Sequence, residues 1–352
     1  MATIYDYLEA CSSKGASDLH ITVGIPPVLR LQGSFLPVTN VRLNNETIKE
    51  LLFPIMNDAH KEELEKMGQV DFAVQISTGD RFRTNIYKQR GNYAAAFRLI
   101  NSKVPNYKAL GIPDTVVQFG LENNGLVLVT GATGSGKSTS LAAMVDFANS
   151  NRNAHIITIE DPIEYVHTHK KSIINQREVG TDTDSFAGAL RAALREDPDV
   201  ILLGEIRDAE TIATAITASE TGHLVLTTLH TTGVVSTIDR IIDVFPPTQQ
   251  QQIRVQLSMV IKGIINQRLI PKKDGKGRVA AIEVMVATPA IRNLIREGKT
   301  QNIYNTMITS KSAGMKTMDN ALADLYNRGL ISEEMVIFNC NDEDYVRKLL
   351  NS

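Results

Sequence analysis

The sequence predicts an α/β protein in two parts, a small α+β domain followed by a larger domain with a parallel β-sheet. From residue 124 to about 285, short uninterrupted apolar runs alternate with segments of helical periodicity. This alternation is typical of parallel strands whose two faces are both covered by helices. Residues 1–100 instead alternate short apolar runs with turn residues, which favours an antiparallel sheet with a few helices. Helical patterns dominate residues 286–352.

Length and composition exclude several classes of protein. A chain of 352 residues predicts two or three domains, each large enough to bury its own core. A net charge of −2 argues against a protein that coats nucleic acid. The two cysteines, Cys11 and Cys340, form neither a tetracysteine zinc site nor a disulfide framework. Because no run reaches the roughly 18 apolar residues of a membrane span and no signal peptide is present, we expect a soluble cytoplasmic protein without a transmembrane segment.

The first domain is expected to contain three helices and five strands, with a hairpin turn at Gly91-Asn92. The predicted helices are 5–13, 48–56 and 59–67, and the predicted strands are 19–23, 27–31, 71–75, 81–89 and 93–99. Residues 101–123 contain two prolines and two glycines with weak periodicity. This composition predicts a linker that acts as a hinge.

In the second domain, strands and helices alternate along the chain. The predicted strands are 125–130, 154–159, 200–203, 224–228 and 278–286, and the predicted helices are 137–149, 186–194, 209–219, 249–269 and 317–327. Residues 272–277 are expected to form an exposed polar hairpin. The basic cluster there would also suit a nucleic-acid translocase, but a solvated hairpin is the favoured explanation.

The strongest functional signal is the segment 131–138, Gly-Ala-Thr-Gly-Ser-Gly-Lys-Ser. It matches the phosphate-binding pattern G-x-x-x-x-G-K-[ST] in full, with a predicted strand before it and a helix after it, which argues against a chance glycine-rich turn. The backbone N–H groups are expected to surround the phosphates of ATP. Lys137 is expected to reach the β- and γ-phosphates and Ser138 to bind Mg²⁺. The complete candidate binding set is Thr133, Gly134, Ser135, Gly136, Lys137, Ser138 and Thr139.

Carboxylates follow two of the predicted strands. The strand 200–203 ends at Gly204-Glu205, and Glu205 is the candidate that polarises an attacking water, unless it merely faces solvent. Gly204 stands where many P-loop enzymes have an Mg²⁺-directing aspartate. The segment 159–165, Ile-Glu-Asp-Pro-Ile-Glu-Tyr, offers a second acidic source. Glu164 is the first choice for positioning metal or water and Glu160 the second. The alternative is that these groups cap a turn or pair with arginine.

Histidine and arginine side chains complete the candidate site. His230 follows the strand 224–228, at the end where parallel strands present ligands, whereas His223 at the strand start is expected to be structural. Phosphoryl transfer benefits from a guanidinium near the γ-phosphate, often supplied by a neighbouring subunit. The candidate arginines are Arg81, Arg83 and Arg98 in the first domain and Arg195 and Arg207 in the second. The alternative for each is that it is a solvated surface group, as most surface arginines are.

These four segments, in this order, resemble the secretion-type ATPases, with their Walker A loop, Asp box, atypical Walker B and His box. The resemblance is strongest to the type IV pilus retraction ATPases, the twitching-motility or PilT family. Residues 14–20, Lys-Gly-Ala-Ser-Asp-Leu-His, and 290–299, Ala-Ile-Arg-Asn-Leu-Ile-Arg-Glu-Gly-Lys, look like signatures of that family. Segments 179–186, 314–326 and 341–350 also resemble the accessory PilU-type ATPases. Pilus-assembly and type II secretion ATPases, with their four-cysteine motif, are less similar.

The resemblance implies a PAS-like N-terminal domain over 1–100, a RecA-like ATPase core over 124–285 and a helical C-terminal part. It also implies a homo-hexamer that holds ATP and Mg²⁺ between neighbouring subunits, with Arg81, Arg83 and Arg98 facing the γ-phosphate. Such a ring would dock beneath an inner-membrane pilus platform protein, at the inner face of the cytoplasmic membrane, and would work with a paralogous retraction ATPase. The helix expected at 290–299 serves either the core or a partner contact. A nucleotide-binding regulator with little turnover is a further possible function.

Overall fold

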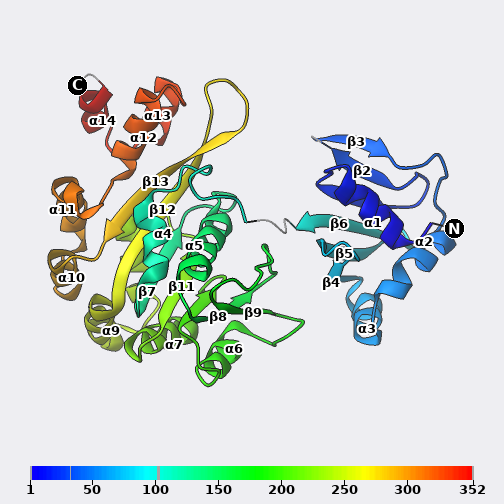
Figure 1. Ribbon diagram of the computed structural model, residues 1–352, viewed down its shortest axis with the longest axis horizontal. Coiled ribbons are helices and arrows are strands. Elements are labelled where there is room, and N and C mark those ends of the chain that lie inside the picture. The colour runs from blue at the N-terminus through cyan, green and yellow to red at the C-terminus, as the bar shows by residue number, and fades with distance from the viewer. Residues whose placement is uncertain (1, 32, 101–103, 351–352) are drawn as a thin grey trace. The chain divides into compact units, whose positions relative to one another are not determined.

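A computed structural model describes residues 2–31, 33–100 and 104–350 (Figure 1). The chain divides into two compact units. The first comprises residues 1–103 together with Glu164–Val166, and the second comprises Val104–Ile163 and His167–Ser352.

The first unit is built on a six-stranded antiparallel sheet with the strand order β3-β2-β1-β6-β5-β4. Three helices cover one face, where Leu19, Phe82 and Phe97 are completely buried. The strands are β1 (Asp18–Ile21), β2 (Val28–Leu31), β3 (Ser34–Pro37), β4 (Gln69–Gln75), β5 (Arg81–Gln89) and β6 (Asn92–Ile100). The helices are α1 (Ile4–Ser13), α2 (Asn45–Leu52), the 3₁₀-helix η1 (Phe53–Ile55) and α3 (Asp58–Met67).

The hairpin between β5 and β6 confirms that a tight turn joins the two strands but places it one residue earlier than predicted, because Asn92 is already paired with Gln89 as the first residue of β6. Arg90 (φ 48°) and Gly91 (φ 74°) both adopt the left-handed conformation, as a two-residue type I′ turn requires. The edge strand β3 was not predicted. All four of its residues are exposed, so it lacks the alternation of buried and exposed residues that marks a strand in sequence.

The second unit contains a seven-stranded sheet with the order β13-β12-β7-β11-β10-β8-β9, in which only β13 is antiparallel. The strands are β7 (Gly125–Thr130), β8 (His155–Glu160), β9 (Ile173–Glu178), β10 (Val200–Leu203), β11 (Leu224–Leu229), β12 (Ile261–Pro271) and β13 (Arg278–Val286). Helices α4 (Asp114–Gln118) and α5 (Lys137–Asn151) pack on one face. The opposite face is covered by α6 (Phe186–Ala193), α7 (Ala209–Glu220), α8 (Val234–Asp243), α9 (Pro247–Val260) and α10 (Pro289–Arg296).

The helix predicted over 249–269 is wrong in its second half. Helix α9 ends at Val260, and β12 begins at once with Ile261. The β-branched residues Ile261, Ile264 and Ile265 are completely buried in the sheet, where β12 pairs with both β7 and β13. Tertiary pairing therefore decided the structure of a segment whose apolar residues lie at helical spacing in the sequence.

The expected linker over 101–123 is shorter than predicted. Its residues 101–103 lie outside the described part of the chain, and residues from Val104 onwards belong to the second unit. Helix α4 and the 3₁₀-helix η2 (Phe119–Leu121) occur there, and Val116, Val117 and Phe119 are buried against β7 and α5. The prolines and glycines of this segment shape a packed connection within the unit.

Of the C-terminal helices, α12, α13 and α14 pack against the β12–β13 hairpin, whereas α11 packs in the core beside α10. The elements are η3 (Thr300–Asn302), α11 (Ile303–Thr309), η4 (Lys311–Ala313), α12 (Met318–Asn327), α13 (Glu333–Asn339) and α14 (Glu343–Leu350). The buried carboxylate of Asp319 accepts hydrogen bonds from the Tyr304 hydroxyl (2.6 Å) and from the backbone of Asn341 (2.7 Å). Among the described residues, no helix is long and apolar enough to cross a membrane.

Helix α10 occupies most of the segment 290–299. Ile291 and Ile295 are completely buried, and the Arg292 guanidinium donates to the carbonyl oxygens of Ser258 (2.9 Å) and Met259 (2.5 Å) at the C-terminus of α9. A cation at this position satisfies terminal helix carbonyls and complements the helix dipole. The apolar residues of this helix and Arg292 therefore belong to the packed interior of the second unit.

Candidate nucleotide-binding site

The phosphate-binding loop lies between the end of β7 and the start of α5. Gly136 is the N-cap of α5 and has φ 89°, in the left-handed region, which favours glycine. No side chain caps this helix in the structure, so no capping side chain competes with an anion for its N-terminus. Residues 132–134 at the tip of the loop are exposed. The loop therefore presents backbone donors to solvent at the positive end of a helix dipole.

Lys137 and Ser135 provide a test of whether a nucleotide phosphate fits this loop. The Lys137 ammonium, which is buried, donates to the carbonyl oxygens of Gly131 (2.9 Å) and Ala132 (3.1 Å). The Ser135 hydroxyl is buried and makes no hydrogen bond with the described residues. A phosphate would give both groups a charge-assisted partner. Ser138 and Thr139 follow in the first turn of α5, so the predicted binding set occupies one continuous loop and helix start.

Glu205 and His230 lie together at the ends of neighbouring parallel strands. A Glu205 carboxylate oxygen is 3.2 Å from Nε2 of His230 and another is 2.5 Å from the Arg207 guanidinium. Only 16% of the Glu205 side chain is exposed. The Thr228 hydroxyl donates to the Gly204 carbonyl (2.6 Å) and so fixes the backbone just before Glu205. Sequence reasoning did not single out Thr228, because a threonine inside an apolar strand carries no distinctive pattern.

The two acidic candidates of segment 159–165 are placed differently. Glu160 ends β8 and accepts hydrogen bonds from Thr158 (2.6 Å) and Gln176 (3.2 Å). Glu164 is exposed, and its contacts assign it to the first unit. No cluster of three or more acidic, histidine or cysteine side chains suited to a metal ion occurs among the described residues. A Mg²⁺ site of the P-loop kind needs no such cluster, because phosphate oxygens, water and the Ser138 hydroxyl supply its ligands.

The candidate arginines of the first unit share the sheet face opposite the helices. Arg83 on β5 lies directly across from Arg98 on β6, and Arg98 lies across from Asp18 on β1. The Arg98 guanidinium donates to Asp18 (2.9 Å). Arg81 is on the same face, two residues before Arg83. In the second unit, Arg195 is exposed and Arg207 contacts Glu205, so Arg207 is the arginine that the structure brings to the predicted acidic residue.

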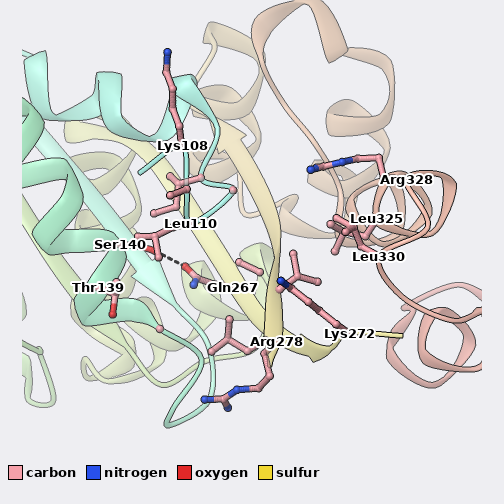
Figure 2. Close-up of a pocket in the computed structure, with 17 residues that line it drawn as sticks. Lys108, Leu110, Thr139, Ser140, Gln267, Lys272, Arg278, Leu325, Arg328 and Leu330 are labelled. Carbon is pink, nitrogen blue, oxygen red and sulfur yellow. Dashed lines mark hydrogen bonds between the residues drawn. The ribbon is translucent and has the colours of Figure 1, made fainter. Parts of the chain in front are cut away.

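A cavity of about 360 Å³ continues from the loop along the first turn of α5 (Figure 2). Gly136, Thr139 and Ser140 line its loop side, and Gln267 on β12 faces them. Apolar side chains and four cations form the remaining wall: Leu110, Ile112, Leu269, Leu325 and Leu330, with Lys108, Lys272, Arg278 and Arg328. Because Gly136 and Thr139 also belong to the candidate phosphate-binding set, the cavity adjoins that loop. Sequence reasoning missed Gln267 because it had assigned that residue to a helix.

The fold and the loop together define a P-loop α/β protein preceded by an antiparallel domain. Residues 68–336 match the family described as Type II/IV secretion system protein, and the chain belongs to that family. It is 48% identical over 331 residues to the type IV pilus retraction ATPase PilT of Pseudomonas aeruginosa, which covers 94% of this chain and 96% of that protein. It is 46% identical to a twitching motility protein of Neisseria gonorrhoeae, over 88% of this chain and 82% of the relative.

Two further comparisons refine this placement. The type IV pilus ATPase PilU of P. aeruginosa is 41% identical over 97% of this chain and 90% of its own length. The crystal structure of the pilus retraction motor PilT with bound ADP superposes with a TM-score of 0.92 at 48% identity and covers 99% of this chain and 100% of that one. The predicted fold class and the predicted family are thereby confirmed.

Proposed function

We propose that this protein hydrolyses ATP to power retraction of type IV pili. The observation that carries the proposal is the 48% identity to a pilus retraction ATPase over nearly the full length of both chains. The geometry supports it, because an open phosphate loop, a buried carboxylate at the end of β10 and a cavity beside α5 occur in one unit. ADP bound to the similar PilT structure supports an adenine nucleotide as the ligand.

In this proposal, residues 133–139 bind the phosphates of ATP. Lys137 exchanges its two loop carbonyls for phosphate oxygens and stabilises the charge that develops during transfer. Glu205 orients the attacking water and accepts its proton, while His230 and Arg207 hold the carboxylate in place. Mg²⁺, held by Ser138 and water with Glu164 as a further candidate, would neutralise charge on the β- and γ-phosphates.

The assembly proposed is a homo-hexamer with ATP between neighbours. Arg81, Arg83 and Arg98 then act on the γ-phosphate of an adjacent subunit, since guanidinium groups supplied in trans are a common device in P-loop enzymes. Rotation of the first unit relative to the second would convert hydrolysis into motion of a partner. We place the ring in the cytoplasm, against a platform protein of the inner membrane. The protein would act together with a paralogous ATPase, a role consistent with its similarity to both PilT and PilU.

The proposal is tested in cells by replacing Lys137 with alanine in the native gene, with Lys66→Ala, an exposed residue of α3, as the control. We expect more surface pili and loss of twitching motility, because pili that cannot be retracted accumulate. Fewer or no pili would show that the protein drives assembly and would overturn the proposal.

The accessory role is a second candidate, favoured by the 41% identity to PilU over 97% of this chain. It predicts no change in pilus number or motility when Lys137 is replaced, because a primary motor would remain. Assays of the purified protein distinguish a translocase and a regulator from a pilus motor. ATPase activity that requires DNA would favour a translocase, and nucleotide binding without hydrolysis would favour a regulator.

A further inference from the structure

We propose that Gln267 is a positioning residue of the nucleotide site, which fixes the phosphate loop and α5 against β12 and supplies an amide donor to the nucleotide. The inference rests on the proposed function in that it requires a nucleotide in the loop. It concerns a residue that lies 130 positions after Lys137 and belongs to none of the four sequence motifs.

Gln267 lies alongside the phosphate loop because β12 is longer than the strand next to it. The pairing of β12 with β7 ends at Asn266, which lies opposite Thr130. Thr130 is the last residue of β7, and Gly131 after it begins the phosphate loop. Gln267 is therefore the first residue of β12 beyond its pairing with β7. Its side chain is 4% exposed. A buried polar side chain at this point requires hydrogen-bond partners.

One partner is Ser140 in the first turns of α5. The Ser140 hydroxyl, itself 1% exposed, donates to Oε1 of Gln267 at 2.6 Å (Figure 2). The Ser140 backbone N–H donates to the Gly136 carbonyl (3.0 Å). This serine therefore joins the loop end of α5 directly to β12.

The glycines of the loop show how closely β12 approaches. A Cβ atom at Gly131 would lie 2.4 Å from the Gln267 carbonyl oxygen, and one at Gly136 would lie 2.8 Å from Nε2 of Gln267. A side chain at Gly131 would collide with the β12 backbone, and one at Gly136 would displace the Gln267 amide group. The absence of a Cβ atom at these two glycines thus lets β12 lie close to the loop, and it also lets the loop backbone curve around a phosphate.

The amide nitrogen of Gln267 can donate hydrogen bonds to a ligand. Since Oε1 accepts from Ser140, Nε2 carries both N–H groups, and it has no hydrogen-bond partner among the residues that the structure describes. Gln267 lines the same cavity as Gly136 and Thr139. An oxygen of the bound nucleotide is an acceptor of the right chemistry for this donor.

The residues on either side hold Gln267 in position. Asn266 donates to the buried Glu283 carboxylate of β13 (3.2 Å). Arg268 donates to the Asn339 carbonyl and to Oδ1 of Asn341 (3.0 Å). With both neighbours anchored, the β12 backbone at Gln267 is held in place beside the loop.

The test measures the affinity of the full-length protein for a fluorescent ADP, together with KM and kcat for ATP hydrolysis. Ser140→Ala removes the donor to Oε1, Gln267→Met removes every polar group at similar volume, and Gln267→Glu keeps the acceptor for Ser140 but loses the amide donors. Ser219→Ala is the matched control, because this buried serine donates only to Ala215 in its own helix.

We expect ADP affinity to fall about 3- to 10-fold in Ser140→Ala, in line with the loss of one hydrogen bond, and further in Gln267→Met. Gln267→Glu is also expected to bind weakly, because it lacks the donor. KM should rise in each variant while kcat at saturating ATP changes less than twofold. The double variant Ser140→Ala/Gln267→Met should bind no more weakly than Gln267→Met alone, since the shared bond is lost once.

Wild-type affinity in Gln267→Met and Ser140→Ala, or independent additive losses in the double variant, would overturn the inference. Equal thermal midpoints without nucleotide show that the variants are folded. If Gln267→Met does not fold, Ser140→Ala and Gln267→Glu decide the question. A wild-type protein that binds no ADP, or a Lys137→Ala variant that binds it unchanged, would instead refute the proposed function.

Discussion

The carboxylate of Glu205 lies 3.2 Å from Nε2 of His230, although 25 residues separate them in the chain. The two residues follow β10 and β11, which are adjacent and parallel, with Leu203 paired to Thr227. The carboxyl ends of such strands meet at one edge of the sheet. This relationship places the candidate general base and a group that can orient it on the loop side of the sheet.

Replacing Glu205 with glutamine is expected to preserve ATP binding and to lower the hydrolysis rate by about 10²–10⁴-fold. An amide keeps the size of the side chain but cannot accept a proton from water. Equilibrium binding of a fluorescent ATP analogue and steady-state phosphate release measure the two quantities. Loss of binding in this variant would show that Glu205 has a structural role.

Thr228→Val should slow hydrolysis about 3- to 10-fold with little change in ATP affinity. The substitution removes the hydroxyl that donates to the Gly204 carbonyl (2.6 Å), so the backbone before Glu205 loses a support. Thr227→Val is a close control, because the buried Thr227 hydroxyl has no hydrogen-bond partner in the described chain. Equal effects of the two substitutions on phosphate release would contradict this account.

Arg83 and Arg98 should differ when each is replaced by alanine. Burial by itself would raise the pKa of Asp18, but hydrogen bonds from Ser17 and Arg98 lower it below its usual value. Arg98→Ala therefore removes a partner of a largely buried carboxylate and should reduce both thermal stability and ATP turnover. Arg83→Ala should reduce turnover alone, since no ion pair of Arg83 is found in the described residues. Thermal melts and ATPase assays of the assembled protein check both, and an equal loss of stability would count against this distinction.

Gly263→Ala should destabilise the protein by about 1–3 kcal/mol through overpacking. A Cβ at this position would lie 2.2 Å from Cζ of the buried Phe119 ring. Phe119→Leu should recover part of the loss when combined with Gly263→Ala, although it is itself destabilising. Urea unfolding of the two single variants and the double variant measures the coupling. Strictly additive losses would show that the ring does not pack on Gly263.

Acidification should destabilise the protein through His167. Burial lowers the pKa of His167 to about 4, and its Nδ1 atom is buried without a hydrogen-bond partner in the described chain. The unfolded chain takes up a proton below about pH 6.5, whereas the folded chain resists until about pH 4, so stability falls as the pH falls through this window. The contribution between pH 7.5 and 5 is about 2 kcal/mol.

Urea unfolding at pH 7.5 and 5 checks this contribution by comparing wild type with His167→Gln. The variant should lose less stability on acidification than wild type. His223→Gln serves as the control and should behave as wild type does. An identical loss in wild type and His167→Gln would refute the assignment.

Local sequence identified the parts of the site that are continuous in the chain. The phosphate loop depends on glycine spacing and on a lysine at a helix start, and both are properties of neighbouring residues. The strand ends at Glu205 and His230 were also visible, because an uninterrupted apolar run followed by a polar residue marks the end of a buried parallel strand. Their proximity required only the general rule that parallel strands end at one edge.

The sequence did not predict β12, and therefore missed Gln267. Residues 261–269 carry apolar residues at Ile261, Ile264 and Ile265, a spacing that suits a helix. Their structure as a strand depends on pairing with β7 and β13. The same holds for Phe119, whose ring packs on Gly263, 144 residues later. No local pattern records such a contact.

By itself, the sequence determined the α/β class, the phosphate loop and the family, because these depend on residue types at short spacings along the chain. The tertiary structure alone decided that β12 runs beside the loop, that Ser140 bonds Gln267 and that Arg98 pairs with Asp18. The physical reason is that buried polar groups and sheet edges pair with whichever partner the fold brings within hydrogen-bond distance. In these three cases that partner lies far away in the sequence.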